Sequence, residues 1–578
     1  MVTVSLRPYH KGLTLEAPER EREKTMVGTG VKRILQLVWL LAVLALGARA
    51  EERVERMLPG EKWWGMATAF GGQMPFDAAS DVTIDITQSG YADQYHATLI
   101  SDRGRVLHCE AQTRCRVEGG VITLVSSAEP ISLETAEEGT LRAAFRLMSS
   151  RWFPPSGKTP DLTFFKAPQY NTWIELTYHQ NERDILAYAR SMLDHGFPPG
   201  VFMIDDTWQT AYGDWRFDGN RFRDPKGMCA KLRQMGFAVV LWICPFVGMD
   251  TPAYRLLANG VSPDLPHLRK ERGGFLTAPD GEPAVVKWWN GRSALLDFTD
   301  PLATTWFKGV LDGLVNDYGV SGFKFDGGHL RFYTGNVRAR DPKVSTGQQT
   351  QAYGRFCLDY PICEYRNAYG LAGQPIVERL HDKEHSWKDL ESCVADMIAA
   401  GLLGHSFVCP DMIGGGSWTM ALPGAAFDAE LFVRSCQMQA LCGMMQFSAS
   451  PWRLLGAEGQ RIVCESVRLR QRFVPYIVKT AENSARTGEP MLRNLEYAFP
   501  HQGFASVRDE FLLGEDLLVA PQLKKGAVSR QVILPPGEWV ADDGQRLTGP
   551  RTVTVATPLA RLPHFVRAEA TDVLPGRP

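Results

Sequence analysis

The sequence predicts an α/β protein: a (β/α)8 TIM barrel flanked by an N-terminal β-sandwich and a small C-terminal β-sandwich. Three observations lead to this fold class. The chain has 578 residues, which is too long for a single hydrophobic core. Apolar strands alternate with amphipathic helices through the middle of the chain. Short β segments separated by turn residues occupy the parts before and after it.

The first domain is expected over residues 51 to 168, where apolar and polar residues alternate in short segments such as Asp81–Ile86 and Gly120–Val125. This period of two predicts an antiparallel sandwich. Cys109 and Cys115 are close enough in sequence to form a disulfide across a hairpin of this domain.

The barrel is expected over residues 169 to 477, about the length that eight strand–helix units with inserted loops require. Non-alternating apolar strands predict a parallel sheet that is covered on both faces. We expect strands at Thr172–Tyr178, Val201–Asp205 and Ala238–Ile243, and helices over Glu182–His195 and Lys226–Met235.

The last domain is expected over residues 478 to 567, because Phe511–Pro521 and Gln531–Gly537 return to β character. Residues 568 to 578 are predicted to be disordered.

The first 50 residues predict a signal peptide that follows an N-terminal extension. Val31–Arg33 is basic, Ile34–Leu46 is apolar, and small residues precede a cleavage site after Ala50. Met26 is then a better start than Met1. The protein is expected to be exported, to the periplasm or outside the cell, with no stable membrane insertion after cleavage. A retained membrane anchor is the alternative.

Composition excludes some partners. The net charge of −2 argues against nucleic acid, because phosphate binding needs a basic surface. No Cys or His spacing typical of a metal site occurs, and neither a metal nor another cofactor is expected. The 15 Trp and 28 Phe residues suit both core packing and stacking on sugar rings. The oligomeric state does not follow from the sequence.

Acidic residues follow several predicted barrel strands. Asp326 ends the apolar segment 322–325, and Asp382 comes 56 residues later, after a second apolar run. Barrel enzymes present their reactive groups at such strand ends. Two carboxylates on neighbouring strand ends are the minimum that hydrolysis of a glycosidic bond requires. A single Asp in this position can also be a helix cap, and Asp382 could instead lie in a surface turn capping the helix near Ser386.

Other strand ends carry Asp205 with Asp206, the acidic stretch Leu295–Pro301, and Asp411. Carboxylates gathered at one end of the barrel repel one another, and we expect Lys324 and Arg379 to offset that repulsion.

Five segments then resemble glycoside hydrolase family 31, in the family's order and spacing. They are Trp288–Gly291 with Ala294–Pro301 and Thr305–Phe307, the nucleophile strand Lys324–Asp326, the acid/base loop Asp382–Trp387, Pro410–Gly415, and Phe511–Pro521. The resemblance covers about residues 170 to 545. The segments Ile204–Asp206, Ala211–Asp214 and Phe447–Arg453 resemble the branch that contains the myogenesis-regulating glycosidase and its bacterial relatives.

The resemblance implies that Asp326 is the nucleophile and Asp382 the general acid/base of a retaining mechanism. Lys324, two residues away on the same strand face, should favour the ionised form of Asp326. The pKa of Asp382 should be raised, since an acid must start protonated.

The resemblance also implies that several side chains bind the terminal sugar. Asp205 and Arg379 would contact its hydroxyls, Asp411 would form the adjacent wall, and Trp242 and Trp289 would offer stacking faces. For Asp206, a core or capping role is as plausible as substrate contact.

Two segments depart from the family pattern. Gly327–His329 stands where many members have a Glu, and Gln446–Trp452 where many have an Arg and a His. Both departures weaken an assignment to glucose. His329 either replaces the missing acid in part or faces solvent.

The function expected from the resemblance is exo-hydrolysis of a terminal α-linked sugar from an oligosaccharide or other glycoside, with retention. An α-galactoside is the first choice, because the branch includes α-galactosidase activity. An α-glucosidase, an α-xylosidase or a transglycosylase on the same site are alternatives. A non-catalytic carbohydrate-binding protein on this scaffold is the hypothesis from a different class.

Overall fold

The computed structural model describes residues 51–87, 94–127, 129–260, 271–422, 424–570 and 573. The predicted signal peptide and extension, residues 1–50, and most of the predicted disordered tail lie outside these ranges. Within them, no helix has the length and hydrophobicity needed to span a membrane.

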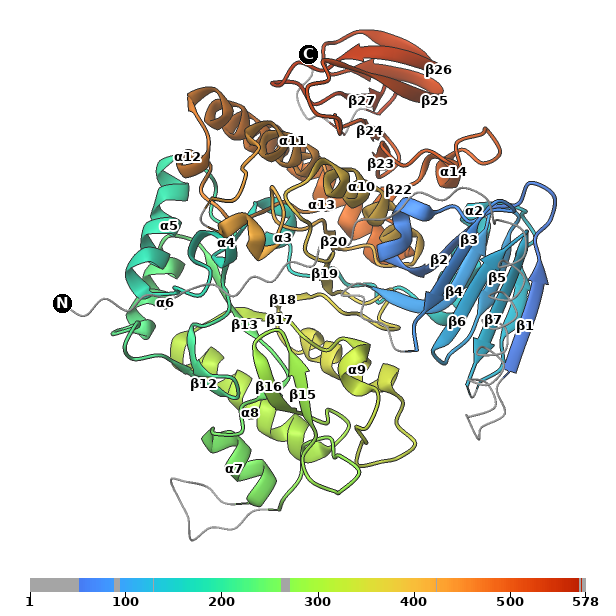
Figure 1. The fold of residues 1–578 in the computed structure, drawn as a ribbon. Coiled ribbons are helices and arrows are strands. Elements are labelled where there is room, and N and C mark those ends of the chain that lie inside the picture. The colour runs from blue at the N-terminus through green and yellow to red at the C-terminus, as the bar shows by residue number, and fades with distance from the viewer. Residues whose placement is uncertain are drawn as a thin grey trace, which may run out of the picture. The chain divides into compact units, whose positions relative to one another are not determined.

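The centre of the fold is a sheet of eight parallel strands, which confirms the predicted TIM barrel (Figure 1). An isolated parallel bridge between Met412 and Gln446 joins the two ends of the sheet. In sheet order the strands are β20 (Val408–Cys409), β19 (Val377–Arg379), β18 (Ile362–Tyr365), β17 (Gly322–Phe325), β13 (Ala238–Ile243), β10 (Val201–Ile204), β9 (Gln169–Asn171) and β21 (Gln446–Phe447).

Helices follow the barrel strands along the chain, and capping side chains fix where several begin. Asn181, Asp224 and Ser386 each accept a backbone N–H in the first turn of α5, α6 and α10. The helices of this region are α4 (Trp173–Leu176), α5 (Glu182–Asp194), α6 (Pro225–Gln234), α7 (Pro252–Asn259), α8 (Pro301–Tyr318), α9 (Thr346–Arg355), α10 (Trp387–Leu402), α11 (Ala429–Ala440), α12 (Pro451–Leu454) and α13 (Ala457–Thr487).

The N-terminal domain consists of two four-stranded antiparallel sheets, as a sandwich requires. Helices α2 (Leu141–Trp152) and α3 (Thr163–Lys166) lead from it to the barrel. One sheet has the order β1 (Glu51–Arg56), β7 (Val121–Ser126), β6 (Thr113–Glu118), β3 (Asp81–Asp85), and the other β2 (Trp63–Ala67), β4 (Tyr95–Ser101), β5 (Arg105–His108), β8 (Ser132–Thr135).

The C-terminal domain has six antiparallel strands around a core that includes Trp539 and Phe565. Arg434 on α11 ties it to the barrel by donating to the carbonyl oxygen of Thr557 over 2.7 Å. The strand order is β22 (Leu492–Arg493), β23 (Phe511–Leu513), β24 (Leu517–Val519), β27 (His564–Arg567), β25 (Ser529–Ala541), β26 (Arg546–Ala556).

Two predicted strand positions are wrong. The strand expected at Thr172–Tyr178 lies instead at Gln169–Asn171, because the Asn171 side chain accepts the Trp173 N–H over 2.8 Å and turns the chain into α4. The stretch Leu295–Pro301 begins at the last residue of β16 (Gly291–Leu295). This strand pairs antiparallel with β14 (Phe246–Val247) and β15 (Val285–Trp288) in a separate sheet. Asp300 of the stretch caps α8 instead of ending a barrel strand.

The expected Cys109–Cys115 disulfide is also wrong. Both residues are buried free thiols. Cys109 directly follows β5 and Cys115 lies in β6, and these strands belong to different sheets of the sandwich. The two residues therefore do not face each other across a hairpin.

Candidate active site

A cavity of about 530 Å³ opens at the carboxyl ends of the barrel strands. Eight of the nine predicted site residues line it, and Asp411 lies behind them. The lining consists of Trp173, Tyr178, Asp205, Asp206, Trp242, Trp289, Asn290, Lys324, Asp326, Arg366, Arg379, Asp382, Met412 and Trp418.

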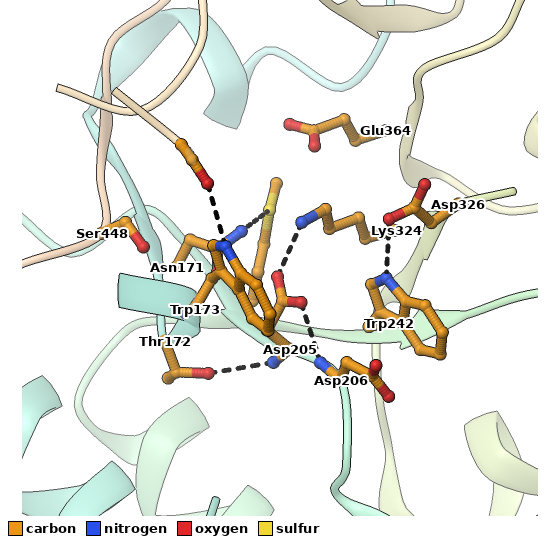
Figure 2. Close-up of polar contacts among 12 residues, drawn as sticks. Asn171, Thr172, Trp173, Asp205, Asp206, Trp242, Lys324, Asp326, Glu364 and Ser448 are labelled. Carbon is orange, nitrogen blue, oxygen red and sulfur yellow. Dashed lines mark hydrogen bonds and ion pairs between the residues drawn. The ribbon is translucent and has the colours of Figure 1, made fainter. Parts of the chain in front are cut away.

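Asp326 directly follows β17, and the turn after it fixes the position of its carboxylate. Gly327 has a φ of +75°, and a Cβ there would come within 2.8 Å of the Pro245 ring, so the position favours glycine. The Asp326 carboxylate accepts the Gly327 N–H over 2.7 Å. It also accepts the Trp242 indole N–H over 3.0 Å (Figure 2). Its two oxygens are thus fixed at the cavity wall.

The charge state of Asp326 suits a nucleophile. Burial alone would raise the pKa of its carboxyl, but Arg366, Lys324 and the Trp242 N–H outweigh burial and lower that pKa to about 2. Asp326 is therefore ionised at neutral pH, and Lys324 contributes to this as predicted.

Lys324 forms a buried ion pair with Asp205, whose Oδ2 lies 2.7 Å from the lysine Nζ (Figure 2). The Thr172 hydroxyl accepts the Asp205 N–H over 2.9 Å, and Asp205 Oδ1 accepts the N–H of Asp206 over 2.8 Å. The Lys324–Asp205 pair lines the same cavity as Asp326 and presents both a hydrogen-bond donor and acceptors there.

Asp382 lies closer to the cavity mouth than Asp326, with side-chain exposures of 37% and 10%. Its Oδ1 accepts from Arg366 Nη1 over 2.8 Å and from Arg379 Nη1 over 2.9 Å. Burial would raise the pKa of this carboxyl, but Arg366, Arg379 and Lys324 together hold it well below its ordinary value. The prediction of a raised pKa is therefore wrong for this arrangement, because two guanidinium groups outweigh the neighbouring negative charge.

Asp382 does not cap the next helix, so the surface-turn alternative is wrong. The Ser386 side chain accepts the Asp389 N–H over 3.1 Å and caps α10.

Arg366 is the charged lining residue that sequence reasoning missed. The other lining residues not predicted are Trp173, Tyr178, Asn290, Met412 and Trp418. It follows β18, the strand between β17 and β19, so Asp326 and Asp382 do not end neighbouring strands as expected. Arg366 Nη2 lies 3.4 Å from Asp326 Oδ1 while its Nη1 binds Asp382. One guanidinium therefore bridges the two candidate catalytic carboxylates.

Arg379 is buried and contacts three acids, of which one, Asp382, lines the cavity. It reaches Glu364 over 3.3 Å and Asp411 over 2.5 Å in addition to Asp382. Asp411 also accepts the Lys383 N–H over 2.8 Å. Asp411 thus fixes the loop that carries Asp382 and does not line the cavity, contrary to the expectation of an adjacent wall.

The remaining predicted residues separate into buried and exposed groups. Trp242 is only 1% exposed and contacts Asp326 through a hydrogen bond from its indole N–H, whereas Trp289 is 42% exposed. Asp206 is buried, and burial raises the pKa of its carboxyl to about 7. It accepts from Asn290, Gln209 and Tyr212 over 2.8, 3.1 and 3.1 Å.

His329 is 2% exposed, so the alternative in which it faces solvent is wrong. Its ring packs against Trp289, with centroids 5.9 Å apart. Among the described residues, no group of three or more His, Cys, Asp or Glu side chains is arranged to hold a metal ion.

Known proteins share both the barrel and the domain after it. Residues 168–480 match the glycosyl hydrolases family 31 TIM-barrel domain, and residues 488–571 match the family's C-terminal domain. The chain belongs to glycoside hydrolase family 31. This confirms the resemblance that the sequence motifs carry.

Two curated relatives illustrate the similarity in sequence. The myogenesis-regulating glycosidase of Mus musculus is 31% identical over 438 residues, which cover 73% of this chain and 58% of that protein. An alpha-xylosidase of Emericella nidulans is 26% identical, over 78% of this chain and 60% of that protein. The chain therefore spans about 60% of the length of these relatives.

Solved structures show the same fold. A family 31 alpha-xylosidase from a soil metagenome, complexed with xylose, superposes with a TM-score of 0.76 at 20% identity, covering 90% of this chain and 80% of that one. A Flavobacterium johnsoniae family 31 dextranase, complexed with glucose, gives 0.75 at 18% identity, covering 90% and 67%.

Proposed function

We propose that the protein is an exo-acting retaining α-glycosidase that works through a glycosyl ester on Asp326. The bridging of Asp326 and Asp382 by one guanidinium carries the proposal. Retaining enzymes hold their two carboxyl groups about 5–5.5 Å apart, close enough for one of them to attack the sugar directly. One guanidinium that contacts Asp326 over 3.4 Å and Asp382 over 2.8 Å holds the two carboxylates in the same part of the cavity, which supports a mechanism in which they act as a pair.

In the first step, an oxygen of Asp326 bonds to the anomeric carbon while the bond to the leaving-group oxygen breaks. Asp382 gives its proton to that oxygen. In the second step, Asp382 takes a proton from water, the water oxygen bonds to the anomeric carbon, and the ester to Asp326 breaks. Two inversions give net retention.

The low pKa of Asp382 fits the second step, in which it must act as a base. For the first step, Asp382 must be protonated, so binding of the sugar has to raise the pKa of Asp382. Hydroxyl groups that bind to Arg366 and Arg379 would compete with Asp382 for the same N–H donors, and desolvation by the sugar would raise the pKa of Asp382. Substrate binding would thus create the acid that the free site lacks.

The sugar that we propose to test first is α-linked galactose, because of the resemblance to the myogenesis-regulating glycosidase branch. α-Glucosides and α-xylosides are the alternatives within the class. An alpha-xylosidase and an alpha-glucosidase are among the relatives in sequence, the latter from Bacillus thermoamyloliquefaciens at 25% identity.

The test is hydrolysis of four nitrophenyl α-glycosides, of galactose, glucose, xylose and 6-sulfoquinovose, with Asp326→Asn beside the wild type. We expect one sugar to be released and turnover to fall by several orders of magnitude in the variant. The anomeric configuration of the first-formed product, followed by NMR, should be α. A β product would contradict retention.

A carbohydrate-binding protein without catalysis is the alternative from another class. The ionised, fully positioned Asp326 disfavours it. The binding-protein alternative would be favoured if none of the four glycosides is hydrolysed and glycan binding persists in Asp326→Asn. A transglycosylase would instead release nitrophenol but transfer the sugar to an added acceptor, which product analysis distinguishes from hydrolysis.

A further inference from the structure

The N-terminal sandwich contacts the candidate active site through one buried side chain, Gln94. This residue directly precedes β4 and has no exposed surface. Its Nε2 donates to the backbone carbonyl oxygens of Arg366 over 3.4 Å and of Arg379 over 3.1 Å. The guanidinium groups of the same two arginines hold Asp382. A residue of another domain therefore contacts both supports of the candidate acid.

The two carbonyl groups lie where the ladder between β18 and β19 ends. The register pairs Tyr365 with Glu378, and Arg366 and Arg379 are the next residues along the chain. Beyond that pair, the amide of Gln94 donates one N–H to each carbonyl group. The two donors of one rigid amide therefore set how far apart these two strand ends lie.

The orientation of the Gln94 amide is fixed within its own domain. The Thr68 hydroxyl donates to Gln94 Oε1 over 3.2 Å, which turns the Nε2 group towards the two carbonyls. Thr68 opens the 3₁₀ helix η1 (Thr68–Gln73), which packs closely on α10, since a Cβ on Gly71 would lie 2.6 Å from the carbonyl oxygen of Ala395. The amide is thus held against the barrel before any substrate binds.

The residue after Gln94 fastens the loop that follows Arg366. The Tyr95 N–H donates to the carbonyl oxygen of Ala368 over 3.0 Å, and Tyr95 forms a parallel bridge with Tyr369. The start of β4 therefore lies alongside this loop like an added strand, and both the loop and the two arginines depend on it.

Asp326 has supports of its own. Its carboxylate accepts from the Gly327 N–H over 2.7 Å and from the Trp242 indole over 3.0 Å. Arg366 comes within 3.4 Å of Asp326 but within 2.8 Å of Asp382. A change in the spacing of the two arginines should therefore affect the candidate acid more than the candidate nucleophile.

We propose that Gln94 is a positioning residue for proton transfer: by setting the spacing of Arg366 and Arg379, it holds the Asp382 carboxylate in its working orientation. This inference rests on the proposed glycosidase function. It makes the N-terminal sandwich a part of the catalytic apparatus. The alternative is that Gln94 serves stability alone, because buried carbonyl groups need hydrogen-bond donors.

The test compares Gln94→Met with the wild type on two substrates that share the terminal sugar preferred among the four nitrophenyl glycosides. Methionine keeps the length of the side chain but removes both N–H donors. A disaccharide needs a proton from Asp382 to depart, whereas fluoride leaves without one. We expect kcat/KM for the disaccharide to fall about tenfold or more, as misplacement of a catalytic group causes. For the glycosyl fluoride, kcat/KM should change less than about threefold.

A series of aryl glycosides of the same sugar gives a graded form of this test. The loss in Gln94→Met should grow with the pKa of the leaving phenol, because poorer leaving groups depend more on the proton. A purely structural role would lower kcat/KM by the same factor across the series.

Gln112→Met is the matched control, because Gln112 is another buried glutamine of the N-terminal sandwich that bonds to the barrel. Its Oε1 accepts from the Thr346 hydroxyl over 2.8 Å and from the Gly347 N–H over 3.1 Å, at the start of α9. Both variants should lower the melting temperature. Gln112→Met should affect the disaccharide and the fluoride alike, whereas Gln94→Met should discriminate between them.

Equal losses on both substrates in Gln94→Met would overturn the proposal, and so would an unchanged kcat/KM for the disaccharide. If Gln94→Met does not fold, Thr68→Val decides, because it removes only the hydroxyl that orients the amide. It should lower kcat/KM for the disaccharide selectively, and a loss shared by both substrates, or none, would overturn the proposal.

The wild type separates this inference from the function on which it rests. If the wild type hydrolyses neither a disaccharide nor a glycosyl fluoride of any of the four sugars, the proposed glycosidase function fails, and the positioning role fails with it. If the wild type hydrolyses both and Gln94→Met does not discriminate between them, the positioning role alone fails.

Discussion

Arg366 donates a hydrogen bond to Asp382 over 2.8 Å and thereby connects the candidate acid to β18, the strand beside the one that Asp326 follows. The same guanidinium lies 3.4 Å from Asp326. Its charge lowers the pKa of both carboxyl groups. Arg366 therefore sets the pH range in which the pair can work as nucleophile and acid.

Replacing Arg366 by Gln should move the pH–rate profile to higher pH. The arginine lowers both pKa values, so removing its charge raises both. The rate falls at low pH when Asp326 becomes protonated and at high pH when Asp382 loses its proton, so both limbs should shift in the alkaline direction. The measurement is kcat against pH for a disaccharide substrate, because kcat reports the pKa values in the enzyme–substrate complex, where Asp382 is proposed to carry its proton.

A glycosyl fluoride serves as the control for this shift, because fluoride leaves without a proton. Its profile should keep the low-pH limb and lack the limb that Asp382 causes. Unmoved limbs in Arg366→Gln would show that the guanidinium does not tune these groups.

Trp242→Phe should slow turnover without disrupting the barrel. The variant keeps the buried ring but loses the N–H that donates to Asp326 over 3.0 Å. A hydrogen bond to a charged group contributes about 1.5–3 kcal/mol, which corresponds to a roughly 10- to 100-fold lower kcat. Steady-state kinetics on a nitrophenyl glycoside would measure this. An unchanged kcat would mean that the indole only fills space.

The two carboxylates can be told apart by their azide products. Asp382→Ala should still form the glycosyl ester from an activated substrate, and azide should then attack that ester and give a glycosyl azide of retained α configuration. Asp326→Ala should give the β azide, because azide then replaces the missing nucleophile directly. NMR of the products decides between these results, and the opposite pattern would exchange the two roles.

The loop that carries Asp382 should depend on a buried ion pair for its stability. Lys383 and Asp396 are 3% and 2% exposed, and their side chains are in direct contact. Asp396→Ala leaves the lysine charge buried and should lower the free energy of unfolding by about 3–5 kcal/mol. Denaturant unfolding measures this loss.

Asp359→Ala is the matched comparison, because Asp359 pairs with Lys308 at the surface over 3.4 Å. An exposed pair contributes at most about 1 kcal/mol. Equal effects of the two substitutions would contradict the structural role of Asp396.

The sequence was sufficient to find Asp326 and Asp382, because each follows a short apolar run and the barrel brings such strand ends together. The same pattern failed for Asp300. Its strand pairs antiparallel outside the barrel, and pairing partners distant in sequence cannot be inferred from a local apolar run.

Arg366 escaped prediction for a different reason. Glu364 interrupts the apolar pattern of β18, and its buried charge is compensated by Arg379 and Gln446, which come from other strands. Only the three-dimensional structure shows that compensation. The pKa of Asp382 was mispredicted for the same reason, since it depends on two arginines whose positions are fixed by tertiary contacts.

Trapping the glycosyl ester tests the central claim most directly. A 5-fluoro-α-glycosyl fluoride of the preferred sugar slows breakdown of the ester, so that intact mass and peptide mass spectrometry can locate the label. We predict one sugar per chain on the peptide that contains Asp326, with no label in Asp326→Ala. A label on another residue, or rapid turnover with inversion and no trapped ester, would contradict the assignment of Asp326 as the nucleophile.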